Sequence, residues 1–483
     1  MPNPKKRGSR VSVHVRIRPL SENELKRGDT KLELEISSPP DVPSADLAPA
    51  ARHSKYGLKL TTPPTDSDSV KTVQVLGFTV PKMVARRDKS YRGFRRVASE
   101  ETDNRNFFRT SVSPAVRAAL AGRTSCVFAY GHTGAGKSHT ILGDGAGEPG
   151  MYEQASAALF EQMAERMRGA GGEEGGGVAA PDAPLLQVRF GEIYNGEFYD
   201  LLGGGARCYV REDADGKIRI RGETDVGTDG TVSTKEQAVA AARLHGEALE
   251  IVRAGIAARK VGSSGIHDQS SRSHAVLELE IVSQHIIDLR EKMNRLLSEK
   301  IKIGHQHDVL KVDIHARQHV KEEGMWVRKP DAKPTTEEEY ETIARLKKES
   351  KAIEKQLEII KTALEAATSG AGCLGGTLVF VDLAGSEHAG NAAEGELSKT
   401  ETEQNECREI NKSLGALGTC FRTLSTGSRS GSCYRGSKLT MVLRDHLRSP
   451  DAGTIMVAAI SPSSFHTTKT IHTMQYAQLV AGY

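Results

Sequence analysis

The chain has 483 residues, of which 37% are hydrophobic and 27% are charged, and its formal net charge is +4 at pH 7. This composition is typical of a soluble globular protein, and so small a net charge does not by itself indicate a polyanionic partner such as nucleic acid. The basic N-terminus lacks the apolar segment of a secretory signal, and no apolar run approaches the roughly 20 residues of a membrane span, so we expect neither feature.

The first predicted elements surround a loop insertion. Polar and apolar residues alternate over residues 11–19, which predicts a strand that ends at Pro19. Residues 37–80 are rich in proline and serine and are predicted to be a loop insertion. A helix is expected at about residues 105–121.

A phosphate-binding motif follows. Residues 131–140 read Gly-His-Thr-Gly-Ala-Gly-Lys-Ser-His-Thr, which contains G-x-x-x-x-G-K-[ST]. In this motif the loop N–H groups surround phosphates, the lysine reaches the β- and γ-phosphates, and the serine hydroxyl binds Mg²⁺. An apolar run at residues 126–130 precedes the loop and helical spacing follows it, which is the strand–loop–helix context the motif needs. An ordinary glycine-rich turn is the alternative interpretation.

The remaining elements alternate between strands and helices. Residues 168–182 are glycine-rich and predict a surface loop. The predicted strands cover residues 185–194, 275–282, 375–382 and 454–460, and the predicted helices residues 235–260, 403–425, 436–448 and 467–480. This order predicts an α/β fold with a central mixed, mostly parallel sheet flanked by helices. The six cysteines form no C-x-x-C pair and no zinc-binding spacing, so we expect free thiols in a reducing cytoplasm.

Residues 285–370 differ from the rest of the chain. They are highly charged and contain two heptad segments, separated by Gly324, Pro330 and Pro334. Two such segments joined by a turn predict an inserted, antiparallel, coiled-coil-like helical hairpin. The alternative is a pair of amphipathic helices lying on the main body. We expect the hairpin to contact a filament or another protein, although a solvated charged surface is the common outcome. The predicted seam comprises Ile286, Leu289, Met293, Leu296, Lys300 and Ile303, and then Ile343, Leu346, Ser350, Ile353, Leu357, Ile360 and Leu364.

Two further segments suit the chemistry of a nucleotide's γ-phosphate. Asp382 ends an apolar strand and can hold Mg²⁺ through a water, while Gly385 can offer an unobstructed backbone N–H. In the other segment, Ser270 and Ser271 can hold waters. Arg272 can pair with Glu387 and so latch the two segments together.

Taken in order, these motifs resemble the kinesin motor domain family over nearly the whole chain. The motifs are Val15–Pro19, Phe128–Thr140, Glu192–Asn195 with Tyr199–Leu202, Ser270–His274, Asp382–Glu387, Ile410–Leu414 with Ala416–Gly418, Tyr434–Thr440 and Ile460–Pro462. The resemblance implies a P-loop ATPase that hydrolyses ATP with Mg²⁺ and is stimulated by microtubules. It also implies a motor domain at residues 1–284 and 371–483, located in the cytoplasm on the cytoskeleton.

The resemblance also assigns roles to residues. It implies that Arg16, Arg18, Pro19 and His139 lie beside the adenine. The phosphates and Mg²⁺ would be held by Gly131, His132, Thr133, Gly134, Ala135, Gly136, Lys137 and Ser138, with Asp382 reaching the metal through water. Catalysis would involve Ser270, Ser271, Arg272, Gly385 and Glu387, and the tubulin contacts would be Lys412, Arg435 and Lys438.

The sequence departs from the family pattern at four places. His267 replaces an asparagine ahead of the paired serines, and His388 replaces an arginine. The segment Glu403-Gln404-Asn405-Glu406 replaces a basic one, and the 285–370 insertion lengthens a connection. These departures leave an alternative open, a nucleotide-binding structural or regulatory microtubule-associated protein with weak turnover. A P-loop enzyme acting on a small molecule is a third alternative. No neck or stalk pattern precedes the end at Tyr483, so we expect either a fragment of a longer chain or a motor-only protein.

Overall fold

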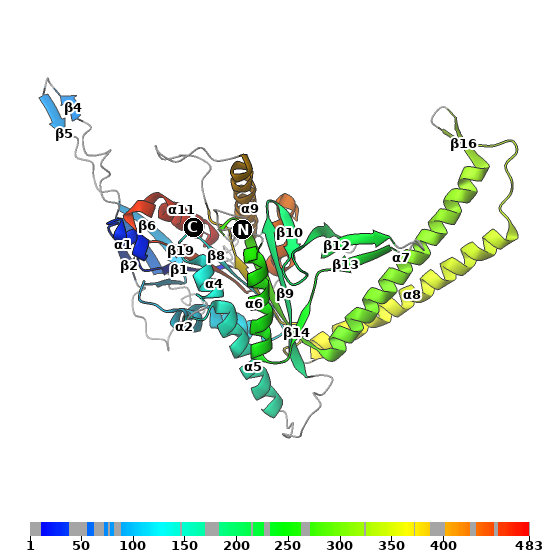
Figure 1. Cartoon of the computed structure of the whole chain (residues 1–483), viewed down its shortest axis with the longest axis horizontal. Helices are drawn as coiled ribbons and strands as arrows, with labels where there is room; N and C mark the ends of the chain where they lie inside the picture. The colour runs from blue at the N-terminus through cyan, green and yellow to red at the C-terminus, as the bar shows by residue number, and fades with distance from the viewer. Residues whose placement is uncertain are drawn as a thin grey trace, which may run out of the picture.

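The computed structural model describes residues 11–37, 56–61, 72–75, 78–81, 88–144, 147–169, 183–213, 216–226, 232–261, 271–322, 325–370, 372–386, 401–425, 431–448 and 453–482. Figure 1 shows a body built around a large sheet, from which a long pair of helices projects to one side. None of the helices in this described part has the length and apolar character needed to cross a membrane.

The central sheet has the strand order β13-β12-β11-β10-β9-β15-β18-β8-β19-β1-β7, with β14 paired to β9. Its strands are β1 (Val11–Ile17), β7 (Arg96–Ala98), β8 (Thr124–Tyr130), β9 (Pro184–Tyr194), β10 (Glu197–Asp200), β11 (Ala206–Glu212), β12 (Ile218–Val226), β13 (Val232–Glu236), β14 (Ala240–Ala242), β15 (His274–Ser283), β18 (Thr377–Asp382) and β19 (Gly453–Ile460). Neighbours along β18-β8-β19-β1-β7 are parallel, whereas β15 and the strands beyond it pair antiparallel. The expected α/β fold with a mixed central sheet is confirmed.

Helices cover both faces of this sheet. Successive residues of β8 point to opposite sides, so Phe128 joins the core beneath α9 (Glu401–Ser425) and α11 (Thr467–Val480). Val127 joins the core beneath α3 (Ser113–Ala119) and α5 (Met151–Gly169). Both side chains are fully buried, which explains why residues 126–130 of this strand form an apolar run. The helices are α1 (Glu22–Lys26), α2 (Asn104–Phe107), α3 (Ser113–Ala119), α4 (Lys137–Leu142), α5 (Met151–Gly169), α6 (His245–Val261), α7 (Gln284–Gln318), α8 (Glu337–Gly370), α9 (Glu401–Ser425), α10 (Lys438–Arg448) and α11 (Thr467–Val480), with a π-helical turn at Phe108–Val112 and 3₁₀ turns η4 (Ser432–Gly436) and η5 (Ser464–His466).

Two expectations about local structure were wrong. The segment 37–80, expected to be a loop throughout, contains β3 (Tyr56–Thr61), which lies between β2 (Glu33–Ser37) and β6 (Asp88–Phe94) and buries Leu58 and Leu60. The same segment contains the hairpin of β4 (Thr72–Val75) and β5 (Phe78–Pro81). Proline-rich flanks obscured these short alternating runs.

The second error concerns the helix expected at residues 235–260. The chain first completes β13 and β14, and the helix begins only at His245. The glycine-rich loop expected at 168–182 lies almost entirely outside the described residues.

The predicted helical hairpin is present, and Figure 1 shows that α7 and α8 project away from the body rather than lying on it. Six of the predicted seam residues are buried between the helices, namely Leu296, Ile303, Leu346, Ile353, Leu357 and Ile360. The polar seam position Lys300 forms an ion pair of 2.9 Å with Glu354 of the opposite helix. At the far end, β16 (His319–Glu322) and β17 (Met325–Arg328) form a small hairpin that the sequence reading did not predict.

The insertion joins two neighbouring strands of the central sheet. Strand β15 leads directly into α7, and α8 returns to β18, the strand next to β15. At the base, the Arg290 side chain of α7 pairs with Glu280 of β15 at 2.5 Å. The hairpin is therefore anchored to the C-terminal end of β15, and His274 lies at the other end of that strand.

Candidate nucleotide-binding site

The loop between β8 and α4 requires its glycines. A Cβ on Gly131 would lie 2.3 Å from the carbonyl oxygen of Ala459, a separation that no side chain can adopt. Gly134 and Gly136 have φ values of +80° and +93°, in the left-handed region that favours glycine. Gly136 directly precedes the first residue of α4, so the loop N–H groups gather at the positive end of a helix dipole.

Lys137 supplies the positive charge of this loop. Its ammonium group donates to the carbonyl oxygens of Gly131 at 3.0 Å and His132 at 2.9 Å, and the residue is only 7% exposed. A lysine ammonium has three donors that can exchange partners. Phosphate oxygens can therefore compete with these carbonyls for the same group.

The phosphate loop contacts the end of β18 directly. The Ser138 hydroxyl donates to Oδ2 of Asp382 at 2.7 Å, and Nη1 of Arg259 donates to the same oxygen at 3.1 Å. The other carboxylate oxygen of Asp382 is buried without a hydrogen-bond partner among the described residues. A buried carboxylate with one open oxygen beside a hydroxyl is a fitting donor set for Mg²⁺ or its bound water. These residues therefore fit the metal that the motif implies.

Arg259 is a residue of this site that the sequence did not predict. It lies in the last turns of α6, is 2% exposed, and also donates to the Ser273 carbonyl at 3.0 Å. Its Nε lies 3.6 Å from a carboxylate oxygen of Glu192. Burial raises the pKa of Glu192, opposed by its hydrogen bond to Ser273 and by the charge of Arg259. No motif marks a single arginine within a helix, so only the folded contacts reveal it.

Backbone hydrogen bonds tie the two predicted γ-phosphate segments to each other and to the loop. The Gly385 N–H donates to the Ser271 carbonyl at 2.9 Å, and the Ser386 N–H donates to the Gly131 carbonyl at 3.1 Å. Nδ1 of His274 accepts from the Ala384 N–H at 3.0 Å, and burial, helped by Arg259 and Lys137, lowers the pKa of His274 to about 3. The Gly385 N–H, which is expected to donate to γ-phosphate, therefore donates to the segment that contains Ser271.

Arg272 has two acidic partners that the sequence did not predict. Its guanidinium pairs with Glu406 and, at 3.2 Å, with Glu403, both in the first turns of α9. The hydroxyl of Tyr194 also donates to Glu406, and burial together with that carboxylate raises the pKa of Tyr194 to about 12. The expected partner Glu387 lies outside the described residues, as do Ser270, His267 and His388.

The residues expected beside the adenine divide into two groups. Arg16 is buried beneath the loop, where it donates to Asn104 and to Thr140 at 2.8 Å, so it braces α4 instead of offering a free surface. Arg18, next to Pro19, donates to the Gly134 carbonyl at 2.6 Å and pairs with Glu24, which holds the pKa of that carboxyl well below its usual range.

The histidines of the loop also differ from one another. The ring of His132 lies 4.6 Å from that of His466, and burial lowers the pKa of His132 to about 2. His139 remains partly exposed, with its Nε2 at 3.0 Å from Glu148. Within the loop Thr133 is exposed, whereas Ala135 is buried.

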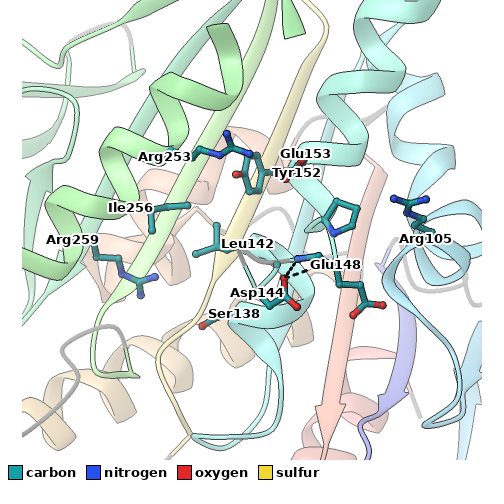
Figure 2. Close-up of a pocket in the computed structure, with 13 residues that line it drawn as sticks. Arg105, Ser138, Leu142, Asp144, Glu148, Tyr152, Glu153, Arg253, Ile256 and Arg259 are labelled. Carbon is teal, nitrogen blue, oxygen red and sulfur yellow. Dashed lines mark hydrogen bonds between the residues drawn. The ribbon is translucent and has the colours of Figure 1, made fainter. Parts of the chain in front are cut away.

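A pocket of about 670 Å³ opens beside α4. Figure 2 shows residues that line it. It is lined by Ser138 and Leu142 of α4, Tyr152 of α5, and Arg253, Ile256 and Arg259 of α6, together with the turn at Glu148. Because Ser138 and Arg259 belong to it, the pocket adjoins the phosphate loop. Its residues come from distant parts of the sequence, so no local pattern predicts it.

The three residues expected to contact tubulin lie on neighbouring elements. Lys412 of α9 is exposed and pairs with Glu409 at 3.2 Å, whereas Arg435 of η4 is 68% exposed and pairs with Glu212 at 2.9 Å. Lys438 of α10 lies 3.8 Å from Glu197. Each cation therefore has an acidic neighbour within the chain.

The chain is similar in sequence to known kinesin-like proteins. The human kinesin-like protein KIF24 is 27% identical over 388 residues, which cover 80% of this chain and 20% of KIF24. The Arabidopsis thaliana kinesin-like protein KIN-13B is 27% identical over 387 residues, which cover 80% of this chain and 39% of that protein. The chain thus spans well under half the length of these relatives.

Solved structures share the architecture. A fast kinesin, studied for its ATPase mechanism and interactions with microtubules, superposes with a TM-score of 0.55 at 20% identity, covering 97% of this chain and 90% of that one. The C-terminal motor and motor homology domain of Kar3Vik1, fused to a synthetic heterodimeric coiled coil, gives a TM-score of 0.56 at 19% identity, covering 98% and 85%. The sequence model of the kinesin motor domain matches residues 16–304 and 347–482, which is most of the chain. The chain therefore belongs to the kinesin motor domain family.

Proposed function

We propose that this chain binds Mg-ATP at the loop of residues 131–138, hydrolyses it, and couples the reaction to a change of pose on a microtubule. The observation that carries the proposal is the junction of Ser138, Asp382 and Arg259, which joins the phosphate loop to β18 and α6. ATP hydrolysis by such proteins depends on positioning and electrostatics, so a pre-aligned junction is the feature it requires.

The residues around this junction divide the work. Lys137 would exchange its loop carbonyls for phosphate oxygens, and the loop N–H groups would hold the remaining charge. Ser138 and Asp382 would hold Mg²⁺, directly and through water. When bound, the metal supplies positive charge that neutralises the phosphate oxygens during cleavage. Arg259 would hold the Asp382 carboxylate in place through its hydrogen bond.

The γ-phosphate would be sensed by a change of partner at Gly385. Its N–H donates to the Ser271 carbonyl. A phosphate oxygen that accepts from this N–H would replace that hydrogen bond between the two segments. That rearrangement would reach α9 through Arg272, which pairs with Glu403 and Glu406 at the start of that helix. Ser270 and Glu387 would complete the closed arrangement, as the family resemblance implies.

The filament contacts would lie on α9, η4 and α10. Lys412, Arg435 and Lys438 would exchange their intramolecular carboxylate partners for acidic groups of tubulin. Such contacts are screened by salt, so affinity should fall as ionic strength rises. The protein would accordingly act in the cytoplasm on the cytoskeleton.

A second candidate is a nucleotide-regulated microtubule-binding protein with weak turnover. The observation that favours it is the pairing of Arg272 with two acids of α9, which competes with the expected pairing to Glu387. Steady-state ATP hydrolysis with and without polymerised microtubules, at low and moderate salt, distinguishes the two candidates. Stimulation that fades with salt supports the motor, whereas ATP binding without stimulated turnover supports the regulated binder.

A further inference from the structure

The far end of the hairpin carries the only tryptophan of the chain on an exposed two-stranded sheet. Strands β16 and β17 pair with each other and with no other described strand. All four residues of β17 are exposed, and Trp326 is 59% exposed, although tryptophan is among the side chains that gain most from burial. Figure 1 shows that β16, at this end of the hairpin, lies far from the central sheet.

One face of the small sheet combines aromatic and basic side chains. The register places Lys321 opposite Trp326 and His319 opposite Arg328. Directly opposite residues share a face and the faces alternate along a strand, so all four lie on the same side. His315 of α7 stacks on His319 with ring centroids 4.3 Å apart and meets Trp326 edge-on at 4.8 Å. We call the set His319, Lys321, Trp326 and Arg328 the tip face.

The two cations of the tip face, Lys321 and Arg328, differ from the cations further down the hairpin. Neither Lys321 nor Arg328 forms an ion pair with another residue in the part of the chain that the structure describes. Further down the hairpin, in contrast, Lys300 pairs with Glu354 at 2.9 Å and Arg317 pairs with Glu339 at 2.7 Å. Two cations without an ion pair to a described residue therefore share a face with the exposed tryptophan.

The tip also lies outside the shared motor pattern. The family match ends at residue 304 and resumes at residue 347, so the outer part of the hairpin belongs to the gap. Of the buried seam residues that the structure describes, only Leu346 lies within residues 305–346, at the end of this gap. Neither the fold of the body nor the nucleotide site requires an exposed tryptophan at this place.

We propose that the tip face binds an extended, acidic segment of a partner protein. Lys321 and Arg328 would pair with its carboxylates, and Trp326 would pack against the apolar stems of its side chains. No described strand pairs with the outer edge of β16 or β17, so a peptide strand could add to this sheet by backbone hydrogen bonds, which a lipid surface cannot do. This proposal does not rest on ATP hydrolysis or on microtubule binding.

The single tryptophan makes the test specific. Its fluorescence in the full chain reports on residue 326 alone, so a short oligoglutamate peptide can be titrated at low salt while emission is recorded. We expect a saturable change in emission intensity and wavelength as Trp326 leaves water. The double substitution Lys321→Glu with Arg328→Glu should weaken peptide affinity by about tenfold or more, because each exposed ion pair is replaced by repulsion.

The matched control changes the same number of charges on the stem. Lys347 and Lys348 of α8 are exposed, and Lys347→Glu with Lys348→Glu should leave peptide affinity unchanged. Far-UV circular dichroism should show equal helix content in both double variants, which separates lost binding from lost folding.

Three results would overturn the proposal. The first is no emission change with oligoglutamate. The second is equal weakening by the tip and stem variants. The third is a response to vesicles of phosphatidylcholine and phosphatidylserine or to single-stranded oligothymidine that exceeds the response to the peptide.

Discussion

The Ser138 hydroxyl of the phosphate loop donates a 2.7 Å hydrogen bond to Asp382, a residue 244 positions away in the sequence. This contact joins the predicted phosphate-binding strand–loop–helix to the strand that carries the predicted magnesium-binding acid. The two segments were predicted separately, and the fold brings them together because β8 and β18 are parallel neighbours.

The first prediction concerns the charge of Asp382. Asp382→Asn keeps the shape of the side chain but removes the negative charge that Mg²⁺ would feel. We expect the Mg²⁺-dependent part of ATP affinity to fall by about 10- to 100-fold, the usual effect of disturbing the outer shell of a metal site. The measurement is a titration of a fluorescent ATP analogue at several Mg²⁺ concentrations. Asp445→Asn at an exposed site is the control, and an unchanged Mg²⁺ dependence in Asp382→Asn would contradict the assignment.

The second prediction tests the close approach at Gly131. A methyl group there would lie 2.3 Å from the Ala459 carbonyl oxygen, so Gly131→Ala must displace either the loop or β19. We expect a loss of about 1–3 kcal/mol in the free energy of unfolding, as for other overpacked sites, together with weaker nucleotide binding. Urea unfolding measures the first effect. Gly246→Ala, where a Cβ meets no atom within 4 Å, should be nearly neutral, and equal losses in both variants would contradict the account.

The third prediction concerns pH. Burial lowers the pKa of His14 and His274 to about 3 and that of His132 to about 2, from an ordinary value of 6.5. The unfolded chain therefore binds more protons than the folded chain below pH 6.5, and stability should fall as pH is lowered through this range. Each histidine contributes a slope of up to about 1.4 kcal/mol per pH unit.

Urea unfolding between about pH 7.5 and pH 5 measures this dependence directly. His274→Gln should reduce the slope by the share of one histidine. Stability that stays constant or rises on acidification would contradict the prediction.

The fourth prediction concerns the link between Arg272 and α9. Arg272 is partly exposed and Glu406 is almost buried, so their ion pair should exceed a typical surface pair in strength. A double-mutant cycle of Arg272→Ala and Glu406→Gln should give a coupling of about 1–2 kcal/mol in the free energy of unfolding. A control cycle pairs Arg272→Ala with Glu401→Gln, which changes the exposed first residue of α9. Its two substitutions should have additive effects on the free energy of unfolding. Additivity in the first cycle would show that this link is not energetically significant.

Local patterns could predict the parts of this protein that depend on neighbouring residues. The glycine-rich loop, the acid at the end of β18 and the heptads of α7 and α8 all have short-range signatures. Arg259 has none, because its contacts with Asp382, Ser273 and Glu192 form only when α6 packs against β9. The pairing of Arg272 with α9 is likewise a property of the fold, whereas its predicted pairing with Glu387 stays a prediction because Glu387 lies outside the described residues.

Short strands were the hardest elements to predict. Strand β3 lies between proline-rich stretches, and its burial of Leu58 and Leu60 depends on β2 and β6 closing around it. Strands β16 and β17 have no buried face in the described part of the chain, so they lack the periodic signal that burial imposes. In both cases the pairing strand, rather than local composition, decides the structure.

The central claim is that nucleotide state and filament affinity are coupled, and it can be measured directly. Co-sedimentation with polymerised microtubules should be compared for the chain saturated with ADP and with a non-hydrolysable ATP analogue, both with Mg²⁺. A motor requires different filament affinities in the two states, and we predict a difference of about tenfold or more, which corresponds to about 1.4 kcal/mol of coupling. Equal affinities in both nucleotide states would contradict the account.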